Sequence, residues 1–162
     1  MNLNVGDVYY FRGEYEQATQ WYRKTLELAP NFPNVRRWLG NAAYSLGNRT
    51  AAAEYFRQAV GAQGERNPAA FVAYLITTGR EEEARERLGR LGQDPVASRL
   101  LAADLAALYT MLGDKEAAFA WLDRAYQERS GSLTFAKVTP VFEPLRSDPR
   151  FQSLLRRLNL ER

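Results

Sequence analysis

The chain has 162 residues, of which 46% are hydrophobic and 25% are charged, values typical of a folded globular protein rather than a disordered one. It contains no cysteine and no histidine, which excludes disulfides, thiolate nucleophiles and the usual general base and transition-metal ligand. The 22 basic and 19 acidic residues are mostly interleaved, as on solvated helix faces, so nucleic acid is not an expected partner.

The N-terminal segment and the hydropathy pattern give no targeting signal. The first residues lack the basic-then-apolar order of a signal peptide. No apolar run approaches the roughly 20 residues that a membrane-spanning helix needs. Because the absence of cysteine also suits a reducing compartment, we expect a cytoplasmic protein without membrane association.

Glycine, alanine and large apolar residues recur along the chain with one step. The glycines are 34, 32 and 34 residues apart, each is followed five residues later by alanine, and four residues further comes a large apolar side chain. The members are Gly13, Gly47, Gly79 and Gly113; Ala18, Ala52, Ala84 and Ala118; and Tyr22, Phe56, Leu88 and Leu122. A step near 34 residues is the length of one helix–turn–helix unit, so the sequence predicts stacked helix pairs.

This register resembles the tetratricopeptide repeat over residues 1–130, with repeats at about 1–32, 33–64, 65–96 and 97–130. The resemblance implies an all-α α-solenoid of about four antiparallel helix pairs, wound as a right-handed superhelix. The first helix of each pair would then line a concave groove. Thr25 and Val72 depart from the small residues that the pattern favours, and tryptophan is missing early in each repeat.

Helix signals in chain order fit eight helices in four pairs. Each glycine is suited to end a first helix, because a left-handed residue is cheap without a Cβ. Pro30 ends the first unit, whereas Asp94 and Pro95 open the fourth as N-cap and first helical residue. The acidic run 81–83 falls in the first turn of a predicted helix, where negative charge is favourable, so we interpret it as structural rather than catalytic.

The tail, residues 131–162, departs from the repeat pattern. Asp148 and Pro149 signal another helix start, and an apolar stripe follows at Phe151, Leu154, Leu155 and Leu158. We expect one or two short helices that cap the last repeat. The stretch 142–151 also resembles a recurrent end of large bacterial proteins, in which such repeats follow a Ser/Thr kinase, an adenylate cyclase or a winged-helix domain.

Mapping the family's concave face onto the first helices gives the candidate binding groove for a peptide or protein. Its predicted residues are Asp7, Tyr10, Phe11, Asn34, Arg37, Asn41, Tyr44, Ala73, Ile76 and Met111. Arg37 and Asn41 match two positions of the carboxylate clamp with which some family members hold a peptide's C-terminus. The following repeats offer Ala73, Leu100 and Asp104 where that clamp needs other residues, so we do not assign its specificity.

The favoured function is a protein-interaction scaffold that binds a partner segment or a neighbouring domain in this groove. The alternative is a self-association or regulatory module of a larger bacterial kinase, cyclase or transcription regulator. No phosphate-binding loop or activated nucleophile is present, so we expect no enzyme activity, no cofactor and no metal. Arg156 and Arg157, with Arg146 and Arg150 upstream, form the densest basic cluster, and we expect these arginines to be solvated or paired.

The first helix begins abruptly, which raises the question of what covers it. Leu3, Val5, Tyr9 and Tyr10 lie on a helix whose apolar face would normally be covered by preceding structure. Open apolar surface at a repeat end favours a homodimer through the N-terminal helix pair. The alternative is a monomer in which Tyr9 and Tyr10 are buried against Trp21 and Tyr22.

Overall fold

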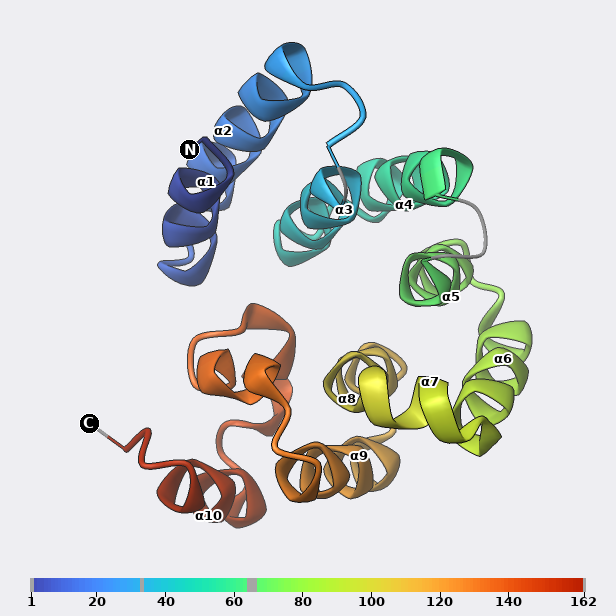
Figure 1. The fold of residues 1–162 in the computed structure, drawn as a ribbon, viewed down its shortest axis with the longest axis vertical. Helices are drawn as coiled ribbons and strands as arrows, with labels where there is room; N and C mark the ends of the chain where they lie inside the picture. The colour runs from blue at the N-terminus through green and yellow to red at the C-terminus, as the bar shows by residue number, and fades with distance from the viewer. Residues whose placement is uncertain (1, 33, 64–66, 162) are drawn as a thin grey trace. The chain divides into compact units, whose positions relative to one another are not determined.

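The computed structural model describes residues 2–32, 34–63 and 67–161, with side chains for 4–32, 34–61 and 67–161. All regular structure in these ranges is helical, and they contain no strand (Figure 1). The prediction of an all-α helical repeat fold is therefore confirmed. Within the same ranges, every helix is too short or too polar to cross a membrane.

Ten α-helices and two 3-10 helices lie within the described residues. They are α1 (Asn2–Phe11), α2 (Tyr15–Leu28), α3 (Val35–Ser45), α4 (Arg49–Gln63), α5 (Pro68–Thr77), α6 (Glu81–Gln93), α7 (Pro95–Leu100), α8 (Ala102–Met111), α9 (Lys115–Gln127), η2 (Gly131–Phe135), η3 (Pro140–Leu145) and α10 (Pro149–Arg157).

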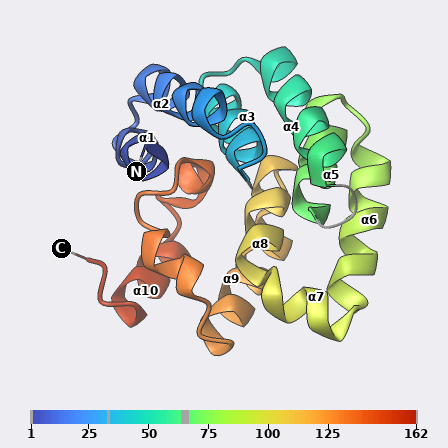
Figure 2. The same cartoon turned by 45° about the horizontal axis from the view of Figure 1, so that its top comes forward.

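The chain divides into two compact units, which we call the N-terminal unit (Met1–Ala84) and the C-terminal unit (Arg85–Arg162). In the N-terminal unit each helix from α1 to α4 packs against the next one, so α5 is the last of this series (Figures 1 and 2). In the C-terminal unit α8 packs against α7, α9 and η3, and α10 packs against α9. The predicted division into an array over 1–130 and a cap over 131–162 stays a prediction.

The repeating residues occupy the predicted environments. All four glycines have φ between 74° and 81°, and the four alanines are fully buried, as are the four large apolar side chains to within 1%. Close helix approach explains the small residues that face these side chains. A Cβ at Gly40 would come within 2.5 Å of Phe56 Cε1, and Gly6 faces the ring of Tyr22 equally closely. The register of glycine, alanine and large apolar residue is therefore confirmed.

The first helix of the fourth repeat is broken, which the sequence did not predict. Asp94 caps α7 as expected, because its carboxylate accepts hydrogen bonds from the backbone N–H groups of Val96 (2.9 Å) and Ala97 (2.7 Å). At Leu101 the backbone leaves helical geometry with φ −108° and ψ 10°. The predicted single helix is therefore two helices, α7 and α8, and the described residues before 131 contain nine helices, one more than four pairs would give.

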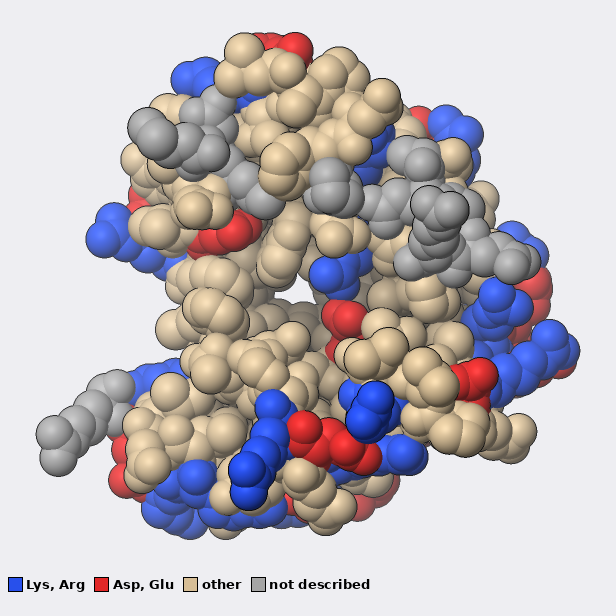
Figure 3. Space-filling model, viewed as in Figure 1, with Lys and Arg blue, Asp and Glu red and all other residues tan. Residues whose placement is uncertain are grey.

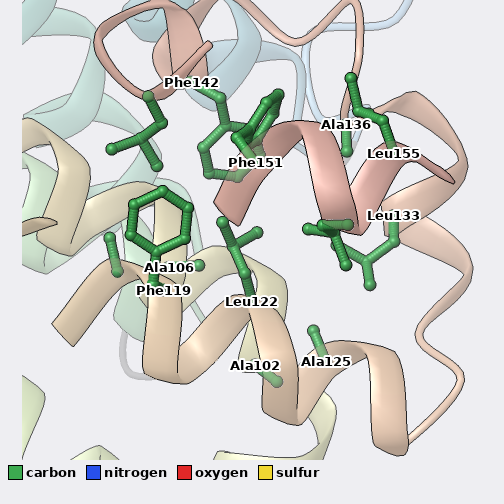
Figure 4. Packing of buried hydrophobic residues seen from close by; sticks show 13 residues of the cluster. Ala102, Ala106, Phe119, Leu122, Ala125, Leu133, Ala136, Phe142, Phe151 and Leu155 are labelled. Atoms are coloured by element: carbon green, nitrogen blue, oxygen red, sulfur yellow. The ribbon is translucent and has the colours of Figure 1, made fainter. Parts of the chain in front are cut away.

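The segment after residue 130 buries several apolar side chains in the C-terminal unit, whereas Phe135 and Val138 are exposed (Figure 4). Phe142 and Phe151 lie with their ring centroids 6.0 Å apart, and they pack in one cluster with Phe119 and Leu122 of α9. The predicted apolar stripe of α10 faces this cluster, with Phe151, Leu154 and Leu155 buried and Leu158 partly buried. At about 1.5–3 kcal/mol for each fully buried side chain, this core is a major source of stability for the unit.

Candidate protein-interaction site

Six of the predicted groove residues lie on two helices of the N-terminal unit, and five of these six keep half-exposed side chains. Asp7 and Phe11 are four residues apart on α1, and Arg37, Asn41 and Tyr44 follow one another at spacings of four and three on α3. Residues at these spacings share one face of a helix. All five side chains are half-buried, so each keeps part of its surface open to solvent. We call these five residues the α1–α3 face.

Trp38 joins the two helices beneath the α1–α3 face. Its ring centroid lies 5.7 Å from that of Tyr10 and 6.4 Å from that of Phe11, both in edge-to-face geometry. The guanidinium carbon of Arg37 lies 5.6 Å from the centroid of the same indole ring. Aromatic and cation–π contacts of this kind hold side chains in defined orientations. The face is therefore supported by a rigid aromatic layer.

Tyr10 belongs to that supporting layer rather than to the surface. Only 3% of it is exposed, and its ring also contacts Tyr15 at 5.8 Å between centroids. Burial raises the pKa of its phenol, against the smaller opposing effect of a hydrogen bond with Ser45. Tyr10 thus stays neutral and covered at all ordinary pH values, and in this conformation a partner does not reach it.

The Asp7 side chain forms a hydrogen bond inside the N-terminal unit. Its Oδ1 accepts a hydrogen bond of 2.8 Å from the hydroxyl of the buried Tyr22. Partial burial raises the pKa of Asp7, and the Tyr22 hydrogen bond offsets part of this effect. The carboxylate therefore links α1 to α2 while part of it still faces solvent.

The other predicted groove residues have different environments. Asn34 is exposed and occupies the N-cap position of α3 in the left-handed region, with φ 67° and no capping hydrogen bond from its side chain. Ala73 and Ile76 on α5 are 4% and 1% exposed. Met111 is half-buried at the end of α8, in the C-terminal unit. The groove assignment stays a prediction at every position, and the α1–α3 face is the part of it with half-exposed side chains on two helices of the N-terminal unit.

One member of the acidic run forms an ion pair. Glu83 bonds Arg80 at 2.5 Å, and this hydrogen bond lowers the pKa of its carboxyl group. Within the described residues, no group of three acidic side chains is arranged to hold a metal ion.

In the C-terminal arginine cluster, pairing is the rule. The pairs are Arg146 with Glu143, Arg150 with Glu116 and Asp148, Arg156 with Glu161, and Arg157 with Asp123. Basic and acidic side chains accordingly lie close together over the lower part of the view in Figure 3, where α9 and α10 are found. The expectation that these arginines are solvated or paired is confirmed.

The first helix matches neither sequence hypothesis completely. Leu3 has a side chain outside the described ones, Val5 and Tyr9 are half-buried, and Tyr10 is buried. Tyr10 shares one cluster with Tyr22, as the monomer alternative expects, but its ring neighbours are Phe11, Tyr15 and Trp38 rather than Trp21. The large apolar side chain that α1 leaves open is Val8, at 51% exposure.

Sequence reasoning missed Trp38, which organises the candidate site. It lies next to Arg37 at a position where the repeat pattern has no fixed residue type, so the register gave no reason to single it out. The available signal was its location on the first helix of a repeat, one residue from a predicted groove residue.

Two family models match the segment that carries the α1–α3 face. One, described as TPR repeat, matches residues 6–47, and another, described as tetratricopeptide repeat, matches residues 38–65. The chain contains tetratricopeptide repeats. Comparison with curated proteins gave no match. Tetratricopeptide repeats are in general protein–protein interaction modules and typically non-catalytic scaffolds.

Proposed function

We propose that the tetratricopeptide repeats of the N-terminal unit bind a segment of another protein, or a neighbouring domain of the parent chain, on the α1–α3 face. The observation that carries this proposal is the combination of polar and aromatic groups on a rigid support. Arg37, Asn41 and Tyr44 form one half-buried row, and Trp38 fixes the direction of Arg37 from below.

The chemistry of this row suits an extended or helical peptide segment. The guanidinium carbon of Arg37 lies 5.6 Å from the indole centroid of Trp38, and its N–H donors suit carboxylates or carbonyls. The amide of Asn41 offers both a donor and an acceptor to a peptide backbone, and the half-buried ring of Phe11 offers apolar contact. For one short peptide we expect a dissociation constant on the order of micromolar.

The test is quantitative capture of partners from a lysate with variants of the full chain. Arg37→Ala/Tyr44→Ala removes two members of the row. Arg36→Ala is the matched control, because Arg36 is a half-buried arginine on the same helix, about 100° around its axis from Arg37. We expect the double variant to lose the captured proteins at least tenfold, as about 1.4 kcal/mol of lost binding energy would produce.

Circular dichroism first establishes that both variants fold like the parent protein. If both variants capture as much as the parent protein, the α1–α3 face does not bind the captured proteins. Loss of capture by both would place the binding surface elsewhere on α3.

Self-association is a second candidate, favoured by the exposure of Val8 on α1 and of Leu28, 78% exposed, at the end of α2. A dimer through the N-terminal helix pair would cover such side chains. Light scattering over a wide concentration range tests it, with Val8→Glu as the disrupting variant and Gln127→Glu on exposed α9 surface as the charge-matched control. A monomer at every concentration refutes it. Tyr10 is unsuitable for this test because it is buried.

A further inference from the structure

Arg150 and Arg157 of α10 each pair with a carboxylate of α9 that lies 34 positions earlier in the chain. Arg150 Nη1 donates to both carboxylate oxygens of Glu116, at 3.0 and 2.8 Å. Arg157 Nη1 donates to Oδ1 of Asp123 at 2.7 Å. The step between the arginines and the step between the carboxylates are both seven residues. The two helices therefore meet in one fixed register.

Each arginine also lies over an aromatic ring of α9. The guanidinium carbon of Arg150 is 4.0 Å from the centroid of Phe119, and that of Arg157 is 4.0 Å from the centroid of Tyr126. The rings too are seven residues apart. Each arginine, its carboxylate and its ring form one unit of contact, which we call a clasp, so α9 and α10 are joined by two similar clasps.

The start of α10 also repeats that of α9 after 34 residues. Asp114 accepts a hydrogen bond from the backbone N–H of Ala117 at the start of α9, and Asp148 accepts one from Arg150 at the start of α10. Each helix ends at a non-glycine residue in the left-handed region, Arg129 with φ 52° and Asn159 with φ 57°. The helix α10 is thus a shortened counterpart of α9.

The segment before α10 occupies the place of a first helix. The 3-10 helix η3 packs against α8, the first helix of the fourth repeat, just as α10 packs against the second helix, α9. Pro144, inside η3, accounts for the missing α-helix, because proline lacks a backbone donor and clashes with the preceding turn. The buried Phe142 and Leu145 still supply the apolar contacts of this position.

We propose that residues 131–162 form a fifth, degenerate repeat, in which proline-containing 3-10 turns replace the first helix and two clasps fix the register of the second. Arg150 and Arg157 are its positioning residues. The apolar side chains supply most of the affinity of α10 for α9, and the clasps select one register among those that the apolar stripe would tolerate. This goes beyond a generic cap, because it assigns each arginine a defined partner one repeat earlier.

Hydrogen exchange of the α10 amides in the full chain tests the clasps. Arg150→Glu/Arg157→Glu should raise exchange by about tenfold, since two exposed ion pairs and two cation–π contacts are lost together. The control is Arg156→Glu, a neighbouring arginine of α10 whose ion pair is with Glu161 rather than with α9. It should stay within about twofold of the parent protein.

Restoring the opposite charges should restore protection. In the quadruple variant, Glu116→Arg and Asp123→Arg are added to the double substitution, and exchange should return part of the way to the parent rate, because the ion pairs are restored and the cation–π contacts are not. If the double variant exchanges like Arg156→Glu, or if the quadruple variant recovers nothing, the clasps do not position α10. The milder Arg150→Lys/Arg157→Lys keeps the charge and should give a smaller increase, so the comparison remains usable if the double variant unfolds.

Cross-linking tests the register of the fifth repeat directly, since the chain has no cysteine of its own. A short bis-maleimide reagent should join Glu116→Cys/Arg150→Cys readily, because the native side chains span this gap end to end, whereas Ala120→Cys/Arg150→Cys, one helical turn away, should be joined more slowly. The Arg157 clasp stays intact in both variants. Equal cross-linking of the two pairs would overturn the 34-residue register.

Discussion

The two units of the chain are built from different core residues. In the N-terminal unit, the rings of Tyr22 and Phe56 pack against glycines of the preceding helix, and Trp38 ties α1 to α3. In the C-terminal unit, alanines and leucines fill the space between α8 and α9, and two phenylalanines from residues 131–162 complete the cluster. Close helix contacts thus stabilise the first unit, whereas added chain segments stabilise the second.

Charge is distributed just as unevenly. Residues 1–84 contain nine basic and nine acidic residues, whereas residues 85–162 contain 13 basic and ten acidic ones. The additional arginines include those that join α10 to α9. In this chain, close packing of glycines against aromatic rings orders the regular helix pairs, and arginine ion pairs add to the apolar contacts where 3-10 turns replace the regular first helix.

Removal of residues 131–162 should have the largest effect on this contrast. It removes Leu145 and Phe151, both fully buried, and at about 1.5–3 kcal/mol each their loss alone costs about 3 kcal/mol or more. We expect the C-terminal unit to unfold or to associate, while the N-terminal unit keeps its structure. Thermal unfolding and sedimentation of the truncated chain check this. Removal of residues 161–162 alone is the control and should change neither, and a monomeric truncation with the parental melting temperature would contradict the prediction.

Gly40→Ala should produce the next largest loss, in the N-terminal unit. The added Cβ would lie 2.5 Å from Cε1 and 2.6 Å from Cδ1 of Phe56, a ring with no room to move because it is fully buried. We expect a loss of about 1–3 kcal/mol in the free energy of unfolding, measured by urea titration. Gly61→Ala, on the next helix with nothing within 4 Å of its Cβ, should be neutral or stabilising, and an equal loss there would refute the packing argument.

Gly92→Ala makes the corresponding test in the C-terminal unit, with a smaller effect. Its Cβ would come within 2.8 Å of Trp121 Cζ2, and this indole is only half-buried, so it can shift. We expect a loss below about 1 kcal/mol, since the alanine also favours the helix. Gly89→Ala, which meets no atom within 4 Å, is the matched control on the same helix. A loss as large as that of Gly40→Ala would show that the C-terminal unit is packed as tightly as the N-terminal one.

The smallest expected effects are opposite pH dependences of two aspartates. Burial raises the pKa of Asp7, so the protein gains stability relative to Asp7→Asn at low pH and loses that gain as the pH rises through the raised pKa. The Arg150 side chain lowers the pKa of Asp148, so its contribution is present above the ordinary value near 3.8 and is lost as the pH falls through the lowered pKa. Asparagine retains the N-cap role at 148.

Urea titrations between pH 3 and pH 7 on the parent protein and the two asparagine variants measure both differences. The two curves, each taken as parent minus variant, should slope in opposite directions. Slopes of the same sign would mean that one of the two carboxylates has an environment other than the one described.

The repeat register was predictable because each of its positions has a steric reason. Few residue types other than those present fit a backbone φ near 75°, the gap between two close helix axes, or the space beside that gap. The three recurring positions therefore predicted the helix pairs. The N-caps at Asp94 and Asp148 were predictable for the same reason, since an aspartate–proline pair has a strong local preference.

Other features depend on contacts that no local pattern encodes. The break at Leu101 follows from no proline or glycine, and the role of Trp38 depends on the approach of α1 to α3. Residues 131–162 have neither glycine nor alanine at the positions where the repeat pattern expects them. Only the distance of 34 residues between each arginine and its carboxylate preserves the repeat, so the pattern did not reveal the partners of Arg150 and Arg157. Of the predicted groove residues, those on α3 have half-exposed side chains, as a surface site requires, whereas the burial of Tyr10 was not predicted.

The glycine between α3 and α4 has a consequence for chirality. Gly47 has φ 75°, and a Cβ built on it would meet no atom within 4 Å, so what restricts this position is handedness and not space. An L-alanine there would be strained by roughly 1–2 kcal/mol. A D-alanine adopts the same backbone without strain and leaves the unfolded chain fewer conformations. A chemically synthesised chain with the mirror-image residue at position 47 should therefore be more stable than the natural protein.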